Sequence, residues 1–180
     1  FLFKNINSYS ENSTNYEEKN DHDIFGIMQL QSALPLKKEF EHSTNFFKPI
    51  ASFKYSPNNS KDISTNNVRM DYTSVFSLNR IGQSDMVEGG KSLSLGVEFE
   101  NQNLNNEKIF GFYLANVIKD RKNLNLPNTS KLNQTRSDII GELDYKANNF
   151  IDLNYKFSFD RDLDHSNYAA IGSTFTINNF

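Results

Sequence analysis

The stretch NRIGQSDMVEGGKSLSLGVEF, residues 79–99, decides the fold class of this chain. It begins as a polar loop that contains three glycines, and it continues as a strand of strict alternation. The two faces of that strand differ in polarity: Leu93, Leu95, Val97 and Phe99 lie on one, and Ser92, Ser94, Gly96 and Glu98 on the other. A period of two residues predicts a β-strand with one apolar and one polar face. A strand this regular after a long loop is typical of an outer-membrane β-barrel.

The composition excludes a helical membrane protein. The chain has 180 residues, of which 37% are hydrophobic, and its mean hydropathy is -0.64. A membrane-spanning helix needs an apolar run of about 18 or more residues, and the sequence has none. The strands of a membrane barrel are only half apolar, so these values are compatible with one. The chain begins at Phe1 and not at Met, from which we expect a fragment or a processed product.

Charge and cysteine content exclude further classes of protein. The net charge is -3 and no basic stripe is present, so nothing indicates binding of nucleic acid. The absence of cysteine excludes disulfides, cysteine-type zinc sites and thiol catalysis in this segment.

The same alternation recurs towards the C-terminus. Residues 150–160 place Ile151, Leu153, Tyr155 and Phe157 on one face, and Asp152, Asn154 and Lys156 on the other. Residues 138–147 form the preceding strand, whose polar face includes Glu142, Asp144 and Lys146. The Asn148-Asn149 pair between them tolerates the backbone conformations of a tight hairpin.

Eight strands are expected in all. The other six cover residues 1–9, 24–32, 48–55, 91–99, 109–118 and 167–178. Residues 109–118 are apolar on both faces, so their orientation is ambiguous, and residues 68–78 are placed in a long loop with some local structure. Most long connections alternate with shorter ones, as in outer-membrane barrels. A linker at 35–47 and a short loop at 161–166 depart from that rule. The strands could close a small barrel or form one arc of a larger one.

Three segments carry a resemblance to a known family. They are FKPIASFKYSPNN (47–59), FSLNRIGQSDMVEGGKSLSLGVE (76–98), and EKIFGFYLAN through LPNTSKLNQTRSDIIGELDY (107–145). Together they resemble the C-terminal barrel domain of the lipopolysaccharide (LPS)-assembly outer-membrane family LptD, also called organic-solvent-tolerance proteins. The central block, with its Asn-Arg pair, Gly, Asp and following strand, is the most specific of the three.

The resemblance implies a function. Members of that family form an outer-membrane translocon that delivers LPS to the outer leaflet through a laterally opening barrel. A periplasmic bridge protein (LptA-like) supplies the LPS, and a lipoprotein (LptE-like) plugs the barrel. Residues 1–180 would then be an interior arc of the barrel domain in a Gram-negative outer membrane, without the periplasmic domain, the closing strands or the family's cysteines.

The loop before the central strand holds the candidate polar cluster. Arg80, Asp85 and Glu88 are close in sequence and could form an ion-pair network, because Arg–carboxylate contacts strengthen in a sheltered lumen. The alternative is a solvated loop with mobile charges. Gly82 and Gly89, with Gly90, are interpreted as turn residues, since no helix follows them as in a phosphate-binding loop.

No catalytic, metal or cofactor site is predicted. Asp160, Asp162 and Asp164 alternate like calcium ligands, but the pattern lacks the Gly and distal Glu of a calcium loop, so a polar hairpin loop is the better interpretation. The three histidines, His22, His42 and His165, lie far apart in predicted loops. No serine nucleophile motif is present, and an enzyme is not expected.

The two faces of the strands predict two surfaces. The predicted lumen-facing residues are Ser92, Ser94, Glu98, Glu142, Asp144, Lys146, Asp152, Asn154 and Lys156. The predicted lipid-facing residues are Leu93, Leu95, Val97, Phe99, Ile151, Leu153, Tyr155 and Phe157. In the translocon interpretation the polar set passes the sugar portion of LPS and contacts the plug.

Two alternatives remain open from the sequence. A porin or another passive barrel would show opposed arginine and acidic clusters, of which only one modest cluster is visible. A secreted, carbohydrate-binding β-sandwich would pack its strand faces against a second sheet and would be soluble as a monomer.

Overall fold

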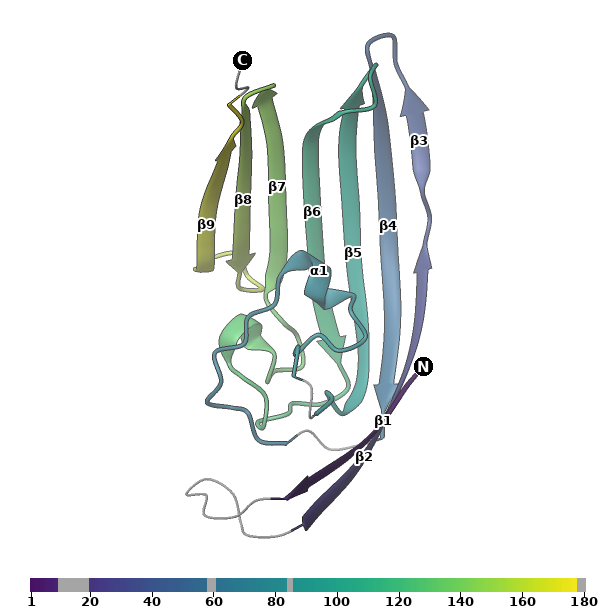
Figure 1. Ribbon diagram of the computed structural model, residues 1–180, viewed down its shortest axis with the longest axis vertical. Helices are drawn as coiled ribbons and strands as arrows, with labels where there is room; N and C mark the ends of the chain where they lie inside the picture. Colours follow the sequence, from purple (N-terminus) through teal and green to yellow (C-terminus); the bar gives the residue numbers. More distant parts are fainter. Residues whose placement is uncertain (10–19, 58–60, 84–85, 178–180) are drawn as a thin grey trace.

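The chain forms one antiparallel sheet (Figure 1). The computed structural model describes residues 1–9, 20–57, 61–83 and 86–177. The strands are β1 (Leu2–Tyr9), β2 (Asn20–Ala33), β3 (Leu36–Glu39), β4 (Ser43–Ser56), β5 (Gly90–Asn103), β6 (Lys108–Lys119), β7 (Ile139–Asn148), β8 (Ile151–Phe159) and β9 (Ser166–Phe175). Their order in the sheet is β1-β2-β4-β5-β6-β7-β8-β9, with β3 also paired to β4. All eight strands expected from the alternation are present, and the all-β prediction is confirmed.

The linker expected at residues 35–47 is wrong. β2 and β3 both pair with β4 in one continuous register, because Ala33 lies opposite Ile50 and Leu36 lies opposite Phe47. They are interrupted only at Leu34-Pro35, where proline lacks the N–H that a ladder needs. The charged residues of β3, together with that proline, hide the alternation in the sequence. The actual turn is the short segment 40–42.

The two ends of the sheet carry connections of different length. The turns at 40–42, 104–107 and 149–150 are short and lie at one end. The connections at 57–89 and 120–138 are long and lie at the other end, and they contain α1 (Tyr72–Val75) and the 3-10 turn η1 (Thr129–Lys131). We call these two connections the inward loops, because they fold back over one face of the sheet.

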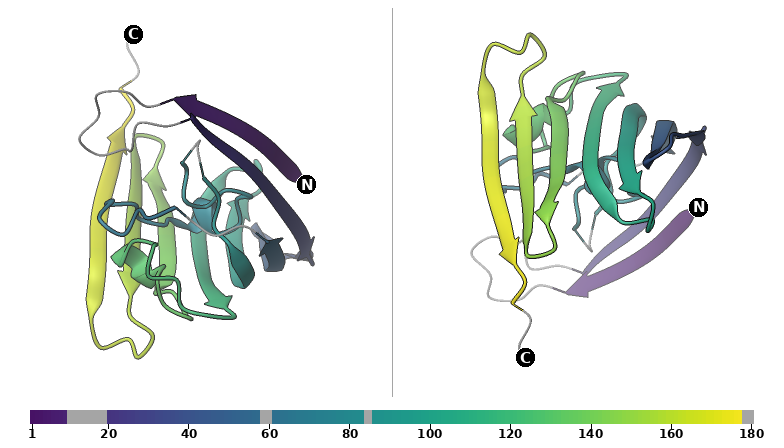
Figure 2. Two further views of the ribbon diagram at one scale, coloured as in Figure 1. Left: turned by 90° about the horizontal axis from the view of Figure 1, so that it is seen from below. Right: turned by 90° about the horizontal axis from the view of Figure 1, so that it is seen from above.

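Figure 2 shows the sheet curving around the inward loops. Their apolar side chains form a core together with inward residues of the sheet: Met70, Tyr72, Val75, Ile81, Met86, Ala115, Val117, Leu126, Leu132 and Ile140. A second, smaller cluster joins Val87 of the first inward loop to Phe25 and Ile27 of β2. The concave face of the sheet is therefore covered at its loop end by the chain's own loops.

The core explains why residues 109–118 are apolar on both faces. Ala115 and Val117 of β6 point to the inward loops and are buried. Leu114 and Ile118 alternate with them and lie on the convex face, in register with Val97 and Leu93 of β5. The sequence of one strand does not show whether an apolar side chain packs against a loop or lies on the outer surface of the sheet.

The burial pattern is inverted relative to a soluble β-protein. On β4 the polar Ser52, Lys54 and Ser56 are buried, whereas Phe53 and Tyr55 between them are 41% and 37% exposed. On β5, Ser92 and Ser94 are buried and Leu93 and Leu95 are exposed. The polar face is thus the covered one, and the apolar face is open.

None of the helices among the described residues combines the length and the apolar character that a membrane crossing requires.

Candidate functional site

The polar residues of the central strands line the concave face. Strand pairing places Glu98 beside Tyr113, Tyr113 beside Glu142, and Glu142 beside Lys156. The same pairing brings the whole predicted lumen-facing set to this side, the side on which the inward loops lie: Ser92, Ser94, Glu98, Glu142, Asp144, Lys146, Asp152, Asn154 and Lys156. These polar residues of β5, β6, β7 and β8 thus share the concave face with the apolar strand residues that pack against the inward loops.

Carboxylates and lysines alternate across this surface. Lys108 Nζ lies 2.6 Å from Asp144 Oδ2, and Lys48 forms an ion pair with Glu98. Asn154 donates from Nδ2 to Glu142 Oε1 at 2.7 Å and to Asp144 Oδ1 at 2.6 Å. Because the cations have partners, the surface is hydrophilic without a strong net charge of one sign. Such a lining suits a polar polymer such as a sugar chain.

Tyr72 connects the first inward loop to the polar surface, and its ring packs against Tyr113 of that surface. Tyr72 of α1 donates its hydroxyl hydrogen to Glu98 Oε1 at 3.0 Å, and Tyr113 donates to Glu100 Oε1 at 2.7 Å. Burial, and then the charge of Glu98, raise the pKa of Tyr72 above its usual value of 10.0. Tyr72 therefore remains a hydrogen-bond donor at any physiological pH.

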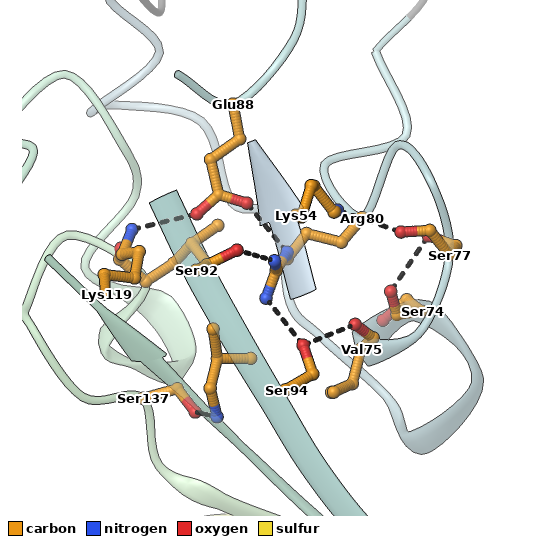
Figure 3. A network of polar contacts seen from close by, with 12 residues as sticks. Lys54, Ser74, Val75, Ser77, Arg80, Glu88, Ser92, Ser94, Lys119 and Ser137 are labelled. Atoms are coloured by element: carbon orange, nitrogen blue, oxygen red, sulfur yellow. Dashed lines mark hydrogen bonds and ion pairs between the residues drawn. The ribbon is translucent and has the colours of Figure 1, made fainter. Parts of the chain in front are cut away.

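A buried ion network attaches the first inward loop to the sheet (Figure 3). Arg80 Nε lies 2.7 Å from Glu88 Oε2, and Lys119 Nζ lies 3.1 Å from Glu88 Oε1. Arg80 also donates to Ser92 Oγ at 2.6 Å and to Ser94 Oγ at 3.4 Å. Two serines of the predicted lumen-facing set thus serve as acceptors for the loop arginine.

The network holds three basic side chains and one carboxylate. Lys54 Nζ donates to the carbonyl of Ser77 at 2.9 Å, and the buried side chains of Arg80, Lys119 and Lys54 surround the carboxylate of Glu88. Burial raises the pKa of Glu88, but the charges of Arg80, Lys119 and Lys54 outweigh burial, and the pKa lies below its usual 4.5. The carboxylate is therefore held in its charged form.

This shift predicts acid lability of the first inward loop. A carboxyl with a lowered pKa stabilises the folded state fully above pH 4.5, and it loses that effect as the pH falls through its folded value. We expect the protection of amides in residues 61–83, measured by hydrogen–deuterium exchange mass spectrometry and corrected for the intrinsic exchange rate at each pH, to fall as the pH is lowered below 4.5. Glu88→Gln should lack this acid-dependent step. The same step in that variant would mean that another carboxyl is responsible.

The other residues predicted for the loop cluster are one aspartate and three glycines. Asp85 lies outside the described residues. Gly82 and Gly90 adopt φ angles of +74° and +95°, which favour glycine and fit the turn interpretation. Gly89 lies half-buried between Glu88 and the start of β5.

Close packing over Gly96 fixes the position of α1. A Cβ atom at Gly96 would lie 2.6 Å from Phe76 Cζ and 2.7 Å from the Leu114 carbonyl oxygen. Phe76 follows α1, whose N-terminus is capped by Asp71 through Ser74 N–H at 2.7 Å. The glycine therefore allows the loop to approach the sheet closely.

Gly96→Val is expected to displace that contact and to lower the free energy of unfolding by about 1–3 kcal/mol, because the core has no room for two more methyl groups. Gly172→Val is the matched control, since a Cβ there meets no atom closer than 3.9 Å. Urea unfolding of both variants measures the difference. Equal losses would show that the packing over Gly96 is not tight.

The convex face carries the predicted lipid-facing residues. Pairing sets Leu93 beside Phe53, Phe99 beside Phe112, and Leu153 beside Tyr145. The complete set lies on this face: Leu93, Leu95, Val97, Phe99, Ile151, Leu153, Tyr155 and Phe157. Phe157 is nevertheless only 9% exposed, because its ring lies over Gly141 on the neighbouring strand. Whether this face meets lipid stays a prediction.

Neither the histidines nor the aspartate loop forms a metal site in the described part of the chain. His42 and His165 are exposed, and the side chain of His22 lies outside the described set. Asp160 Oδ1 accepts the backbone N–H groups of Asp164 and His165, and so caps its own turn. No group of three or more His, Asp or Glu side chains among these residues is arranged to hold an ion.

Three polar residues of the site were not predicted. Lys54 and Lys119 join the Glu88 network from distant parts of the sequence. Lys54 was expected on the polar face of its strand and Lys119 in the loop after residue 118, and neither position indicated the contact. Asp138 is fully buried, and its Oδ2 accepts from Ser158 Oγ at 3.0 Å and from Asn167 Nδ2 at 2.9 Å. It ties the second inward loop to β8 and β9, and its polar position in the strand pattern was the only signal.

Comparison with known proteins agrees with this architecture. Residues 4–179 match the family described as LptD, LPS transport system D. No curated protein matches the chain. The match covers nearly the whole sequence, including the three segments whose resemblance was noted above. The chain therefore belongs to the LptD family, whose members take part in LPS transport at the outer membrane of Gram-negative bacteria.

Proposed function

We propose that this sheet is an arc of a closed barrel that spans the outer membrane and passes LPS to the outer leaflet. The observation that carries the proposal is the inverted burial of β4 and β5. Lys54, Ser92 and Ser94 are covered, while Phe53 and Leu95 are open. An antiparallel sheet with this polarity fits an environment in which its apolar face meets hydrocarbon and its polar face encloses water or polar cargo.

The apolar convex face supports a membrane environment. It extends from β4 to β8, and soluble monomers rarely expose contiguous apolar patches of this kind. Burial of apolar surface is worth about 25 cal/mol per Å², so exposure of the whole face to water would be costly. β4 and β5 have 14 residues each, more than the roughly 9–11 that a tilted strand needs to cross a bilayer.

The two alternatives are less well supported. A β-sandwich requires a second sheet, whereas the described strands form one sheet that packs against loops. A passive porin shares the polar concave face, but the family match favours LPS as the cargo. In the translocon the sugar portion of LPS would pass along the ladder of carboxylates and lysines at the hairpin end.

We also propose where two protein partners, which the family implies, would act. A hollow of about 590 Å³ on the sheet near the hairpin end is lined by polar side chains that include Lys108, Asp144 and Asn154. A plug lipoprotein (LptE-like) would seat against this part of the concave face. A bridge protein (LptA-like) would supply LPS from the periplasm.

Site-specific photocrosslinking in cells tests the proposal. A photoreactive residue replaces Asp152, which lies on the concave face, or Leu153, which is its convex neighbour. We expect LPS adducts from position 152 during active LPS export and phospholipid adducts from position 153. LPS adducts from neither position, in a protein that inserts normally, would contradict the translocon and leave a passive barrel.

A further inference from the structure

A polar pocket of about 490 Å³ opens between the second inward loop and the β8–β9 turn. It is separate from the polar concave face and from the Glu88 network. Its charged lining is Lys122, Lys131, Arg136, Arg161, Asp160 and Asp162. Four basic and two acidic side chains give the pocket an excess of two positive charges. The whole chain, in contrast, has a net charge of -3.

Three of these cations have no carboxylate within ion-pair distance in the described part of the chain. Arg161 forms an exposed ion pair with Asp162 at 3.3 Å. Among the described residues Lys122, Lys131 and Arg136 form no ion pair, unlike the lysines of the concave face, which have carboxylate partners. The Asp160 carboxylate accepts hydrogen bonds from backbone N–H groups of its own turn. The pocket therefore holds basic side chains that no described carboxylate engages in an ion pair.

The walls of the pocket are fixed by backbone contacts. Lys119 N–H donates to the Thr135 carbonyl at 2.8 Å, and Arg136 bridges to Ile118, so the returning loop extends β6. Lys131 and the preceding Ser130 both adopt left-handed backbone angles, with φ of +49° and +54°. Such angles are strained for residues other than glycine and persist only where the surroundings determine them. The neighbouring residues thus determine the backbone conformation from which the Lys131 side chain extends.

A phosphate group fits this arrangement better than a carboxylate does. A phosphate monoester carries between one and two negative charges and three strong acceptor oxygens. It therefore matches two unbalanced positive charges and several donors, whereas a carboxylate carries only one charge. Arginine and lysine are the side chains that bind phosphate in proteins.

We propose that this pocket binds a phosphate group, either on the sugar headgroup of a glycolipid or as free inorganic phosphate. The glycolipid source rests on the proposed function, because it requires the long-loop end of the sheet to reach the headgroup layer. The binding of phosphate itself does not require it. Failure to bind phosphate and failure to export LPS are therefore separate results.

Calorimetric titration of the full-length protein in a non-ionic detergent tests the pocket with three probes: glucosamine 6-phosphate, glucosamine and inorganic phosphate. We expect glucosamine 6-phosphate to bind and glucosamine not to bind. Tighter binding of the sugar phosphate than of phosphate would identify a headgroup site, and equal binding would identify a site for the free anion. No binding of either phosphate probe would overturn the proposal.

Variants then locate the site. Lys131→Gln combined with Arg136→Gln should weaken binding of the phosphate probes at least tenfold. Asp162→Asn should strengthen it two- to threefold, because it releases Arg161. Lys91→Gln is the charge-matched control, since Lys91 is exposed at the same end of the sheet but does not line the pocket. Binding that the double variant leaves unchanged, or that Lys91→Gln weakens as strongly, would overturn the assignment.

Discussion

Glu88→Ala is expected to detach the first inward loop at a cost of about 3–5 kcal/mol in local opening free energy, the range found when a buried ion pair loses one partner. The substitution leaves Arg80, Lys119 and Lys54 buried around a site that no longer holds a carboxylate. Hydrogen–deuterium exchange of residues 61–83 measures the opening free energy. Protease cleavage within the same loop gives an independent readout.

Glu107→Ala is the matched control for this substitution. Glu107 lies in the β5–β6 turn and forms an ion pair with Lys146 at 3.3 Å, with 44% of its side chain exposed. Exposed pairs contribute about 0–1 kcal/mol, so this variant should leave the loop unchanged. A loss below 1 kcal/mol for Glu88→Ala would show that the buried network does not hold the loop.

Leu153→Arg is expected to lower the free energy of unfolding in a bilayer by about 2–4 kcal/mol if the residue lies near the middle of the membrane. Leu153 is 41% exposed on the convex face, where a charged side chain would replace a contact with hydrocarbon. Unfolding by urea from lipid vesicles measures the change. Asp152→Asn, on the opposite face, should have little effect.

Thr174→Arg introduces the same side chain on the concave face. Thr174 pairs with Asp152 on the adjacent strand, so it lies at nearly the same height as Leu153. A new cation facing polar groups should change stability by less than about 0.5 kcal/mol. Equal losses for the two arginine variants would mean that the faces are assigned wrongly.

The alternation of the strands was predictable because it expresses a single physical rule. In most strands the two faces lie in different environments, and side chains that alternate with a period of two residues show that difference directly in the sequence. The rule failed at β3, where Pro35 and a run of charged residues interrupt the pattern although the pairing continues. A charged edge strand close to a hairpin does not need to alternate, since both of its faces are exposed.

The buried network was only partly predictable. Arg80 and Glu88 are neighbours in sequence, and their charges suggested contact. Lys54 and Lys119 come from strands on either side of β5, so only the register of three strands brings them to Glu88. The apolar core of the inward loops was hidden for a similar reason, because its members have no local periodicity.

The core of the inward loops also sets an order of assembly. Its members range from Met70 to Ile140, and its three strand residues, Ala115 and Val117 of β6 and Ile140 of β7, face the loops only when these strands are part of the sheet. Contacts between residues so far apart in sequence form late. Closing the chain between them costs conformational entropy before the contacts can contribute any stabilising free energy. We therefore expect the hairpins from β5 to β8 to pair first and the loops to fold inward last. Loss of protease cleavage in residues 61–83 would then mark the moment at which a newly inserted sheet is complete.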